Sequence, residues 1–310
     1  MKKFILKVSA FIFAIIFLLV IILLLPPTPK ASKSIFFGKI KKDSLLQNEA
    51  SPRIIFLGGS NLSFGLDSQT IKDSLGLNPI NTGIHAPLGI KYMLENTLQY
   101  IKNGDIIVLV PEYHHFCWDW DKGSDGLVLT VLDVDKSKIK LLSLGQIINC
   151  IPFTNNHIMS KLNKDSYQNI VEDDIYSVNS FNQYGDTYTH WNRQRVDSIK
   201  VHTIVVEEYN PEIMAGIKKI NQKFQKKGAL LSISFPGYQD ISFRNSEEFI
   251  KKVEQEYLAA GFTILGTAER YKMPDSLIFD TPYHLNKKGV DRRTRLLIED
   301  LRKELLKPRH

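Results

Sequence analysis

The residues best suited to chemistry lie far apart in the chain. Ser60 follows two glycines, and Asp280 and His284 stand close together on a proline-containing stretch more than two hundred positions later. A histidine needs an anionic partner on one ring nitrogen to fix its tautomer, and its other nitrogen can then take a proton from a serine hydroxyl. If these three side chains meet, the chemistry that they suit is attack by a serine on an acyl group.

Each of these residues also has a simpler interpretation. Gly-Gly-Ser is common in turns, where the serine closes the turn or caps a helix, and an aspartate and a histidine before a helix can be satisfied by backbone groups. Residues 60–65 could instead cradle a phosphate, but they lack the lysine and the glycine spacing of a phosphate-binding loop. The catalytic interpretation is favoured because the three residues occur in a workable order on an α/β pattern.

Strands and helices alternate along the segments that must position these residues. Residues 53–58 form an apolar run after Arg53 that ends at two glycines, as a buried parallel strand would. Further strands are expected at 78–83, 106–111, 229–235 and 262–265, and helices at 67–76, 88–101, 211–227, 246–260 and 289–306. This alternation predicts an α/β fold with a central, mostly parallel sheet. If the last strand lies beside the first, the loop that carries His284 emerges at the same carboxyl edge as Ser60, where open sheets bind ligands.

The alternation stops between residue 114 and about residue 210. This segment is rich in Asp, Asn, Ser, Tyr and Trp, with short apolar islands at 127–132 and 141–151. We interpret it as an insertion of short helices and loops. A long irregular segment inside a compact domain is usually functional, so we expect it to cover the carboxyl edge of the sheet and to shape a substrate cleft.

Residues 1–27 predict a membrane anchor. Residues 4–25 are almost entirely apolar and precede two prolines, a length that suits a helix crossing a bilayer of about 30 Å. An uncleaved signal anchor is favoured over cleavage near Ala31-Ser32, because a cleaved signal has a shorter apolar core. A very short amino-terminal tail normally stays in the cytoplasm, which would place everything after Pro27 outside.

Composition bounds the rest of the chain. Residues 28–51 are rich in Pro, Lys and Ser and are expected to be a polar linker, with residues 52–310 as the folded domain. The formal net charge of the 310 residues is +7, and much of it lies in the two termini. A membrane surface explains the amino-terminal lysines better than nucleic acid does.

Cysteines and histidines give no sign of a metal or redox site. Cys117 and Cys150 cannot form a C-x-x-C pair, and we expect two buried thiols, although an extracytoplasmic domain could bridge them. His114 and His115 are adjacent, and adjacent histidines rarely bind one ion together. We therefore expect no metal and no cofactor.

The residues singled out above resemble a known family. Residues 58–61, Gly-Gly-Ser-Asn, look like the first conserved block of the SGNH/GDSL hydrolase superfamily, and Gly83 matches the glycine of its second block. Asp280 and His284 fall where the final acid–histidine block belongs. The stretch 280–289 is especially similar to the membrane-anchored branch near the D-alanyl and alginate acyl-transfer proteins.

The resemblance implies a fold and a set of roles. The fold would be a three-layer sandwich of SGNH or flavodoxin-like type. Ser60 would be the nucleophile, His284 the general base and Asp280 its orienter. The backbone N–H groups of Ser60 and Gly83 would bind the developing oxyanion.

Two departures from the family pattern affect the site. The acid normally precedes the histidine by three residues, whereas Asp280 and His284 are four apart. The third block normally supplies an asparagine to the oxyanion hole, and here residues 110–113 read Val-Pro-Glu-Tyr. Asn61 or Tyr113 could substitute for that donor.

Three further residues are near the site by position and are candidates to line it. His85 stands beside Gly83, where a histidine on a surface loop is the simpler interpretation. Glu112 and Tyr113 follow the third strand, and the sequence assigns them no specific role.

Two functions follow as hypotheses. The first is a membrane-anchored, extracytoplasmic serine esterase or O-acyltransferase, which would act through an acyl-enzyme on acyl esters, above all acetyl esters, of cell-envelope polysaccharide. A multi-pass membrane protein could donate the acyl group. The second is an inactive SGNH-like module that binds glycan or a membrane acyltransferase partner, which the two departures keep open.

Overall fold

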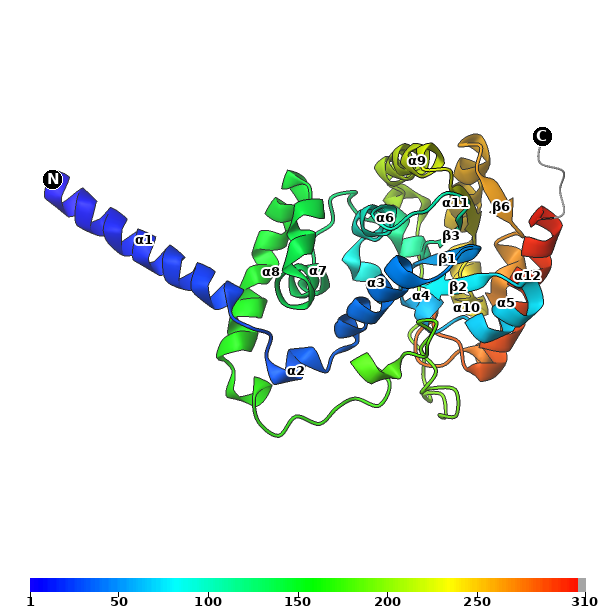
Figure 1. Cartoon of the computed structure of the whole chain (residues 1–310), viewed down its shortest axis with the longest axis horizontal. Coiled ribbons are helices and arrows are strands. Elements are labelled where there is room, and N and C mark those ends of the chain that lie inside the picture. Colours follow the sequence, from blue (N-terminus) through cyan, green and yellow to red (C-terminus); the bar gives the residue numbers. More distant parts are fainter. Residues whose placement is uncertain (306–310) are drawn as a thin grey trace.

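The centre of the molecule is a sheet of five parallel strands in the order β2-β1-β3-β4-β6 (Figure 1). The computed structural model describes residues 1–305. The strands are β1 (Arg53–Gly58), β2 (Asn78–Asn81), β3 (Ile106–Val110), β4 (Leu230–Ser234) and β6 (Thr263–Leu265). The α/β class and the parallel central sheet, predicted from the alternating pattern, are confirmed.

Two of the three inner strands, β1 after Arg53 and β3, are apolar because they are covered on both faces. Ile55 of β1 is paired with Ile107 of β3, and both side chains are fully buried. A strand that faces water on neither side needs no polar alternation. This is why β1 and β3 could be recognised as continuous apolar runs.

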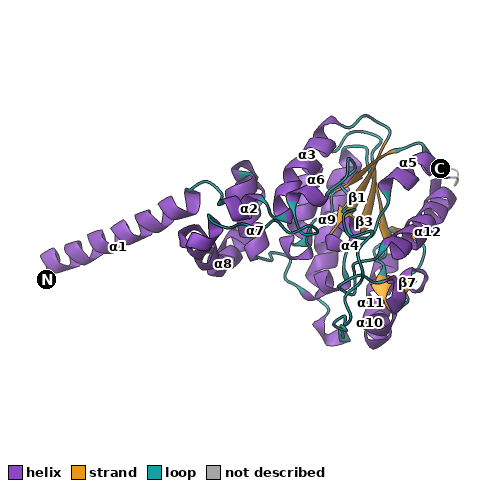
Figure 2. Ribbon diagram, turned by 90° about the horizontal axis from the view of Figure 1, so that it is seen from below, coloured by secondary structure: helices purple, strands orange, loops and turns teal. Residues whose placement is uncertain are grey.

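Helices pack against the sheet from two sides. In Figure 2, α6 and α9 lie to one side of the strands, and α5 and α12 lie to the other. The helices around the sheet are α4 (Ser60–Ser63), α5 (Ser68–Leu75), α6 (Ile90–Leu98), α9 (Pro211–Lys226), α10 (Asp240–Asn245), α11 (Glu247–Ala259) and α12 (Lys287–Leu305). Asp67 caps α5 by accepting from the Thr70 N–H, and Gly76 ends that helix with a left-handed backbone.

The last strand does not lie beside the first. β6 pairs with β4, at the edge farthest from β2. The chain then forms β7 (Lys272–Met273), which pairs with β5 (Tyr238–Gln239), before it returns toward β1. The return is fixed by a backbone hydrogen bond from the Leu285 N–H to the Phe64 carbonyl, 3.2 Å. The expected meeting of the two chain regions is therefore made by this loop and not by strand pairing.

The amino-terminal helix α1 (Lys2–Leu24) projects away from the rest of the molecule (Figure 1). None of its residues is buried. It is the one helix within residues 1–305 that is long and apolar enough to cross a membrane, a property that signal sequences share.

Residues 28–51 pack against the domain, which corrects the prediction of a linker. They contain α2 (Pro29–Ser32) and α3 (Gly38–Asn48). Lys42 of α3 is buried and donates to the Asn81 carbonyl at 3.2 Å and to the Gly185 carbonyl at 2.6 Å, while Leu46 is fully buried. A lysine can bury its aliphatic stem when backbone carbonyls satisfy its ammonium group, so polarity alone was a misleading guide here.

The insertion contains one long helix that was not predicted. α7 (Asp125–Leu129) packs against α8 (Leu144–Leu162), whereas residues 163–210 form only short turns and loops, as expected. Ser143 opens α8 with a capping box. Cys117 and Cys150 are free thiols, and Cys150 is buried while Cys117 is half-buried.

Candidate active site

A cavity of about 650 Å³ opens at the carboxyl ends of β1, β2 and β3. The strand order reverses between β1 and β3, which is where open α/β sheets place their ligand sites. The predicted residues that line this cavity are Ser60, His85, Glu112 and His284. The structure thus brings the serine and the histidine, distant in sequence, to one cavity.

Ser60 begins α4 directly after β1. Its Oγ donates to Glu112 Oε1 at 3.2 Å. Gly59 permits this approach, because a Cβ there would lie 2.6 Å from Glu112 Oε1 and 3.0 Å from Ala86. The two glycines before the serine therefore serve the close packing of the ends of three strands.

Asp280 and His284 form the predicted pair. His284 Nδ1 lies 2.8 Å from Asp280 Oδ1, and the His284 side chain is 5% exposed. The His284 N–H donates to the Thr281 carbonyl at 3.1 Å, so the stretch is a tight turn that accommodates a spacing of four residues. The first departure from the family pattern does not prevent the pairing.

Tyr176 completes the pair from within the insertion. Its hydroxyl donates to Asp280 Oδ2 and lies 3.2 Å from His284 Nδ1. Burial alone would raise the pKa of Asp280, but the hydrogen bond and the charge of His284, with the hydrogen bond from Tyr176, outweigh burial and lower that pKa. Asp280 is therefore charged at neutral pH. It can hold the Nδ1 proton of His284 and leave Nε2 free to accept another.

Aromatic packing fixes the His284 ring. It stacks on Phe64 with a centroid separation of 4.2 Å and an interplanar angle of 12°. His190 also packs on Phe64, with 4.9 Å between ring centroids, and its Nε2 lies 2.9 Å from the Leu285 carbonyl oxygen. Phe64 follows Ser60 by four residues, so the same short segment carries the serine and supports the histidine.

Glu112 stands at the end of β3, where the family pattern places an asparagine. It is buried, and its Oε1 accepts from the Asn61 N–H at 3.1 Å as well as from Ser60. Its backbone N–H donates to His115 Nδ1 at 2.9 Å. Burial raises the pKa of Glu112, although the hydrogen bonds from Asn61 and Ser60 oppose this. In residues 1–305 the Ser60 hydroxyl donates to this carboxyl group, not to His284.

Gly83 is used differently from the prediction. Its N–H donates to Asn81 Oδ1 at 3.0 Å, and its carbonyl accepts from Lys42 and Ser63. A Cβ at this position would lie 2.5 Å from the Gly59 carbonyl oxygen. The glycine is required for close packing of two strand ends, and its N–H is already engaged, so the predicted oxyanion donation does not fit this geometry.

Asn61 and Tyr113 do not line the cavity. The Asn61 side chain is fully buried and donates through Nδ2 to the Val110 carbonyl at 3.2 Å. Tyr113 is buried against Tyr238, 5.2 Å between ring centroids, and its N–H donates to the Tyr283 hydroxyl at 3.1 Å. Successive side chains of an extended chain point in opposite directions. Glu112 therefore faces the cavity, and Tyr113 faces the core.

His85 lines the cavity. Burial, with a smaller effect from His284, lowers its pKa to about 4, so it is neutral at physiological pH. Its ring meets Phe36 edge to face at 5.3 Å. Within residues 1–305 its buried Nδ1 has no hydrogen-bond partner.

Tyr176, Phe36 and His202 also line the cavity and were missed. Phe36 comes from the predicted linker, residues 28–51, and Tyr176 and His202 come from the insertion. Their surroundings have no regular hydrophobic period, so no sequence signal marked them.

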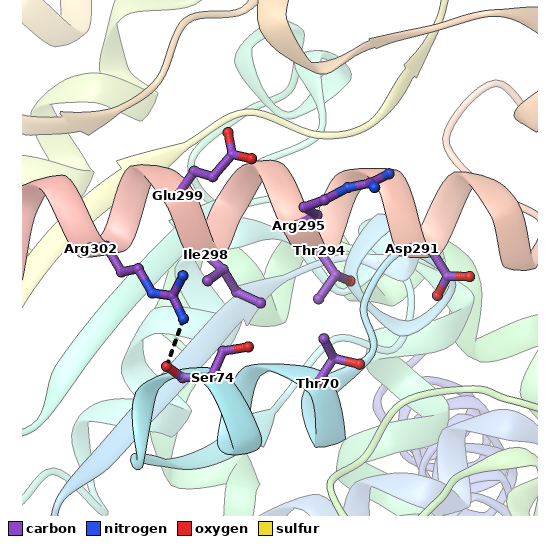
Figure 3. A pocket seen from close by; sticks show the side chains of 8 residues that line it. All are labelled: Thr70, Ser74, Asp291, Thr294, Arg295, Ile298, Glu299 and Arg302. Atoms are coloured by element: carbon purple, nitrogen blue, oxygen red, sulfur yellow. Dashed lines mark hydrogen bonds between the residues drawn. The ribbon is translucent and has the colours of Figure 1, made fainter.

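A second cavity, of about 390 Å³, lies between α5 and α12 (Figure 3). It is lined by Thr70, Ser74, Asp291, Thr294, Arg295, Ile298, Glu299 and Arg302. Arg302 donates to the Ser74 carbonyl at 3.0 Å. Its charged side chains are of both signs, and neither a histidine nor a cysteine is among its lining residues, so it is less suited to catalysis than the cavity at the strand ends.

Within residues 1–305 no three His, Cys, Asp or Glu side chains are grouped as metal ligands. A scan against models of protein families found no match for this chain, and neither did a search of curated proteins.

Proposed function

We propose that this chain is a membrane-anchored serine esterase or O-acyltransferase of SGNH type, with the three-layer sandwich that this type implies. Ser60 is the nucleophile, His284 the general base and Asp280 the residue that orients it. The observation that carries the proposal is that Ser60 and His284 line one cavity at the reversal point of the sheet, and that Asp280 is hydrogen-bonded to His284.

The reaction begins with a rotation of the Ser60 side chain from Glu112 toward His284. Ser60 Oγ then attacks the acyl carbonyl carbon while His284 Nε2 takes the hydroxyl proton. The tetrahedral intermediate breaks its bond to the donor oxygen, and that oxygen leaves with the proton from His284. Asp280 stays ionised throughout and stabilises the positive imidazolium.

Deacylation repeats these steps with a different oxygen. Water or a sugar hydroxyl gives its proton to His284 and attacks the acyl carbon, and Ser60 leaves with the proton returned to its Oγ. Water gives hydrolysis, and a sugar hydroxyl gives transfer of the acyl group.

In this proposal the oxyanion is stabilised by the Ser60 N–H, which faces the Glu112 carboxyl group in the resting site, and by the protonated carboxyl of Glu112 itself. A carboxyl group can donate a hydrogen bond only while it keeps its proton. The burial that raises the pKa of Glu112 favours that form. Glu112 would thus replace the missing asparagine of the third block.

The cavity walls fit an acylated sugar. Phe36, Pro87 and Trp118 supply apolar and aromatic surface, and Ser60, His85 and Glu112 add polar side chains. We infer an acyl ester of an envelope polysaccharide as the substrate, an extracytoplasmic location, and a multi-pass membrane protein as the acyl donor in the transferase case.

Contacts at the end of α1 favour an anchor over a cleaved signal. Lys161 Nζ donates to the carbonyls of Leu25 and Pro26 at 2.7 and 2.9 Å. The candidate cleavage position, Ala31-Ser32, lies inside α2. Cleavage there would remove acceptors that a buried lysine uses.

A fluorophosphonate probe tests the proposal. It should label the wild-type protein and not Ser60→Ala, because the probe reacts with an activated serine. Ser74→Ala, in the cavity of Figure 3, is the matched control and should label like the wild type. Absence of labelling in folded wild-type protein, together with binding to envelope glycan, would instead support the inactive binding module.

A further inference from the structure

Helix α8 carries an apolar surface that no part of residues 1–305 covers. Its side chains form two groups with spacings of three or four, and both groups lie on one side of the helix, with the exposed Asn155 between them. They are Leu144, Ile147, Ile148, Ile151, Met159 and Leu162, and we refer to them as the α8 apolar face. Leu144 is 73% exposed, and Ile151 and Leu162 are each 60% exposed.

The other side of α8 is buried within the domain. Gln146, Cys150 and Ile158 are buried there, and α8 packs against α7. A helix on the surface of a soluble domain normally presents polar residues to water opposite its buried side. The α8 apolar face, which Asn155 alone interrupts between Ile151 and Met159, is therefore a surface for another phase or partner.

The carboxyl end of α1 is held against α8 and its neighbours. Lys161 of α8 donates to the Leu25 and Pro26 carbonyls and pairs with Asp133 at 2.6 Å, and Lys136 donates to the Leu24 carbonyl at 2.8 Å. These bonds satisfy carbonyls that the end of a helix leaves without partners. The exit point of α1 is thus fixed relative to α8.

α8 runs across the direction of α1 rather than alongside it, as Figures 1 and 2 show. If α1 crosses a bilayer, a helix that crosses it at its exit point lies along the membrane plane. Exposed lysines stand near both ends of α8, Lys136 and Lys140 before it and Lys164 after it. Basic side chains beside an apolar helix face suit anionic lipid headgroups.

We propose that α8 lies in the surface of the same bilayer that α1 enters, with the α8 apolar face between the headgroups and the acyl chains. The inference rests on the proposed anchoring by α1. The domain is then held at the membrane by two elements, and its orientation relative to the lipid surface is fixed.

The test uses full-length protein in vesicles of mixed zwitterionic and anionic lipid, with Cys117 and Cys150 replaced by alanine. A nitrobenzoxadiazole fluorophore is attached to Ile148→Cys, and the vesicles carry nitroxide lipids labelled either near the headgroup or near the chain end. We expect the shallow nitroxide to quench this fluorophore more than the deep one. A fluorophore on Leu258→Cys, an exposed leucine of α11, is the matched control and should not be quenched.

A fluorophore on Ile12→Cys in α1 separates this inference from the anchoring. Quenching at Ile12→Cys without quenching at Ile148→Cys would overturn the α8 proposal and leave the anchor intact. Shielding of Ile148→Cys from water without quenching by lipid, rising with protein density in the vesicles, would show a second copy on this face and would also overturn it.

Charge placed on the α8 apolar face gives a second measurement. The double variant Ile148→Glu, Ile151→Glu should lose lipid quenching of a fluorophore on Leu144→Cys, because carboxylates resist entry into the acyl region. The matched variant Leu258→Glu should leave that quenching unchanged. Unchanged quenching in the double variant would overturn the proposal.

Discussion

Glu112 stands at the position where the SGNH pattern has an asparagine. If its neutral carboxyl donates to the oxyanion, Glu112→Gln keeps a donor and should retain activity within about tenfold, whereas Glu112→Ala should lose ~10²–10³ in kcat, the typical loss for one oxyanion donor. Burial raises the pKa of Glu112, so wild-type activity should fall as pH rises through that pKa and Glu112→Gln should not show this fall. Steady-state pH profiles of the three proteins check the prediction.

The opposite ordering would identify a different role for this carboxyl group. If Glu112→Gln is as inactive as Glu112→Ala while both remain folded, the ionised form is required and the donor role is wrong.

Asp280 should matter to catalysis far more than to folding. Asp280→Asn should lower kcat by about 10⁴-fold, because the amide favours the wrong histidine tautomer. Tyr176→Phe, which removes one hydrogen bond to the same carboxylate, should lower kcat by only about tenfold. Single-turnover rates with an acetyl ester measure both. Equal losses in the two variants would contradict the assigned roles.

The lowered pKa of Asp280 also predicts a pH effect on stability. A carboxyl whose folded pKa is depressed adds stability above its unfolded pKa, about 3.9, and that stability disappears as pH falls through the folded value. The difference in unfolding free energy between wild type and Asp280→Asn should therefore narrow as pH falls below about 4. Urea titrations across this range check the sign.

At the scale of elements, a buried ion pair joins β1 to the residue just before β3, and a hydrogen bond joins β1 to α3. Arg53 donates to Asp105 through Nε at 2.8 Å and also to the Leu46 carbonyl at 2.6 Å, and both charged side chains are fully buried. Asp105→Ala would leave a buried guanidinium without its partner and should cost about 3–5 kcal/mol of unfolding free energy. Chemical denaturation measures it.

Two further variants show whether a loss of stability in Asp105→Ala comes from burial of the ion pair. The double variant Arg53→Met, Asp105→Leu should recover most of the loss, since apolar replacements of a buried pair are often neutral. Glu247→Ala, which breaks an exposed pair with Lys251 on α11, should leave the denaturation midpoint unchanged. A similar loss of unfolding free energy in Asp105→Ala and Glu247→Ala would show that burial of the ion pair does not decide its contribution.

The elements that could be predicted are those in which the pattern of apolar residues matches the pattern of burial. β1 and β3 are continuous apolar runs, and the Ile213–Phe224 stripe of α9 has helical spacing. α8 was missed because most of its apolar residues face outward, so its pattern resembles neither a core helix nor a polar surface helix. α3 was missed because buried Lys42 reads as polar in sequence, although carbonyl acceptors make its burial possible.

The site was predictable where residue type and order carried the information. Ser60, Asp280 and His284 could be chosen from their chemistry and their place at predicted strand ends. The engagement of the Gly83 N–H by Asn81 could not, because it depends on the packing of two strand ends against each other. Tyr176 lies in a segment without periodicity, and only the three-dimensional path of the insertion brings it to Asp280.

At the scale of the whole molecule, α1 would place the domain and the amino terminus on opposite sides of a membrane if it spans one. α1 ends at Leu24, and its following carbonyls are bound by Lys161 of the insertion. In that arrangement the domain lies directly against the membrane face from which α1 emerges. If the short lysine-bearing amino terminus stays in the cytoplasm, that face is the outer one.

Thiol labelling in intact cells decides this topology. In a background without Cys117 and Cys150, a membrane-impermeant maleimide should label Leu258→Cys on exposed α11 before lysis, whereas Lys3→Cys should be labelled only after lysis. The reverse pattern would place the domain in the cytoplasm and remove envelope polysaccharide from the possible substrates. A mass for the membrane-bound protein that includes residues 1–27 would in addition establish α1 as an uncleaved anchor, since a processed signal leaves no such mass.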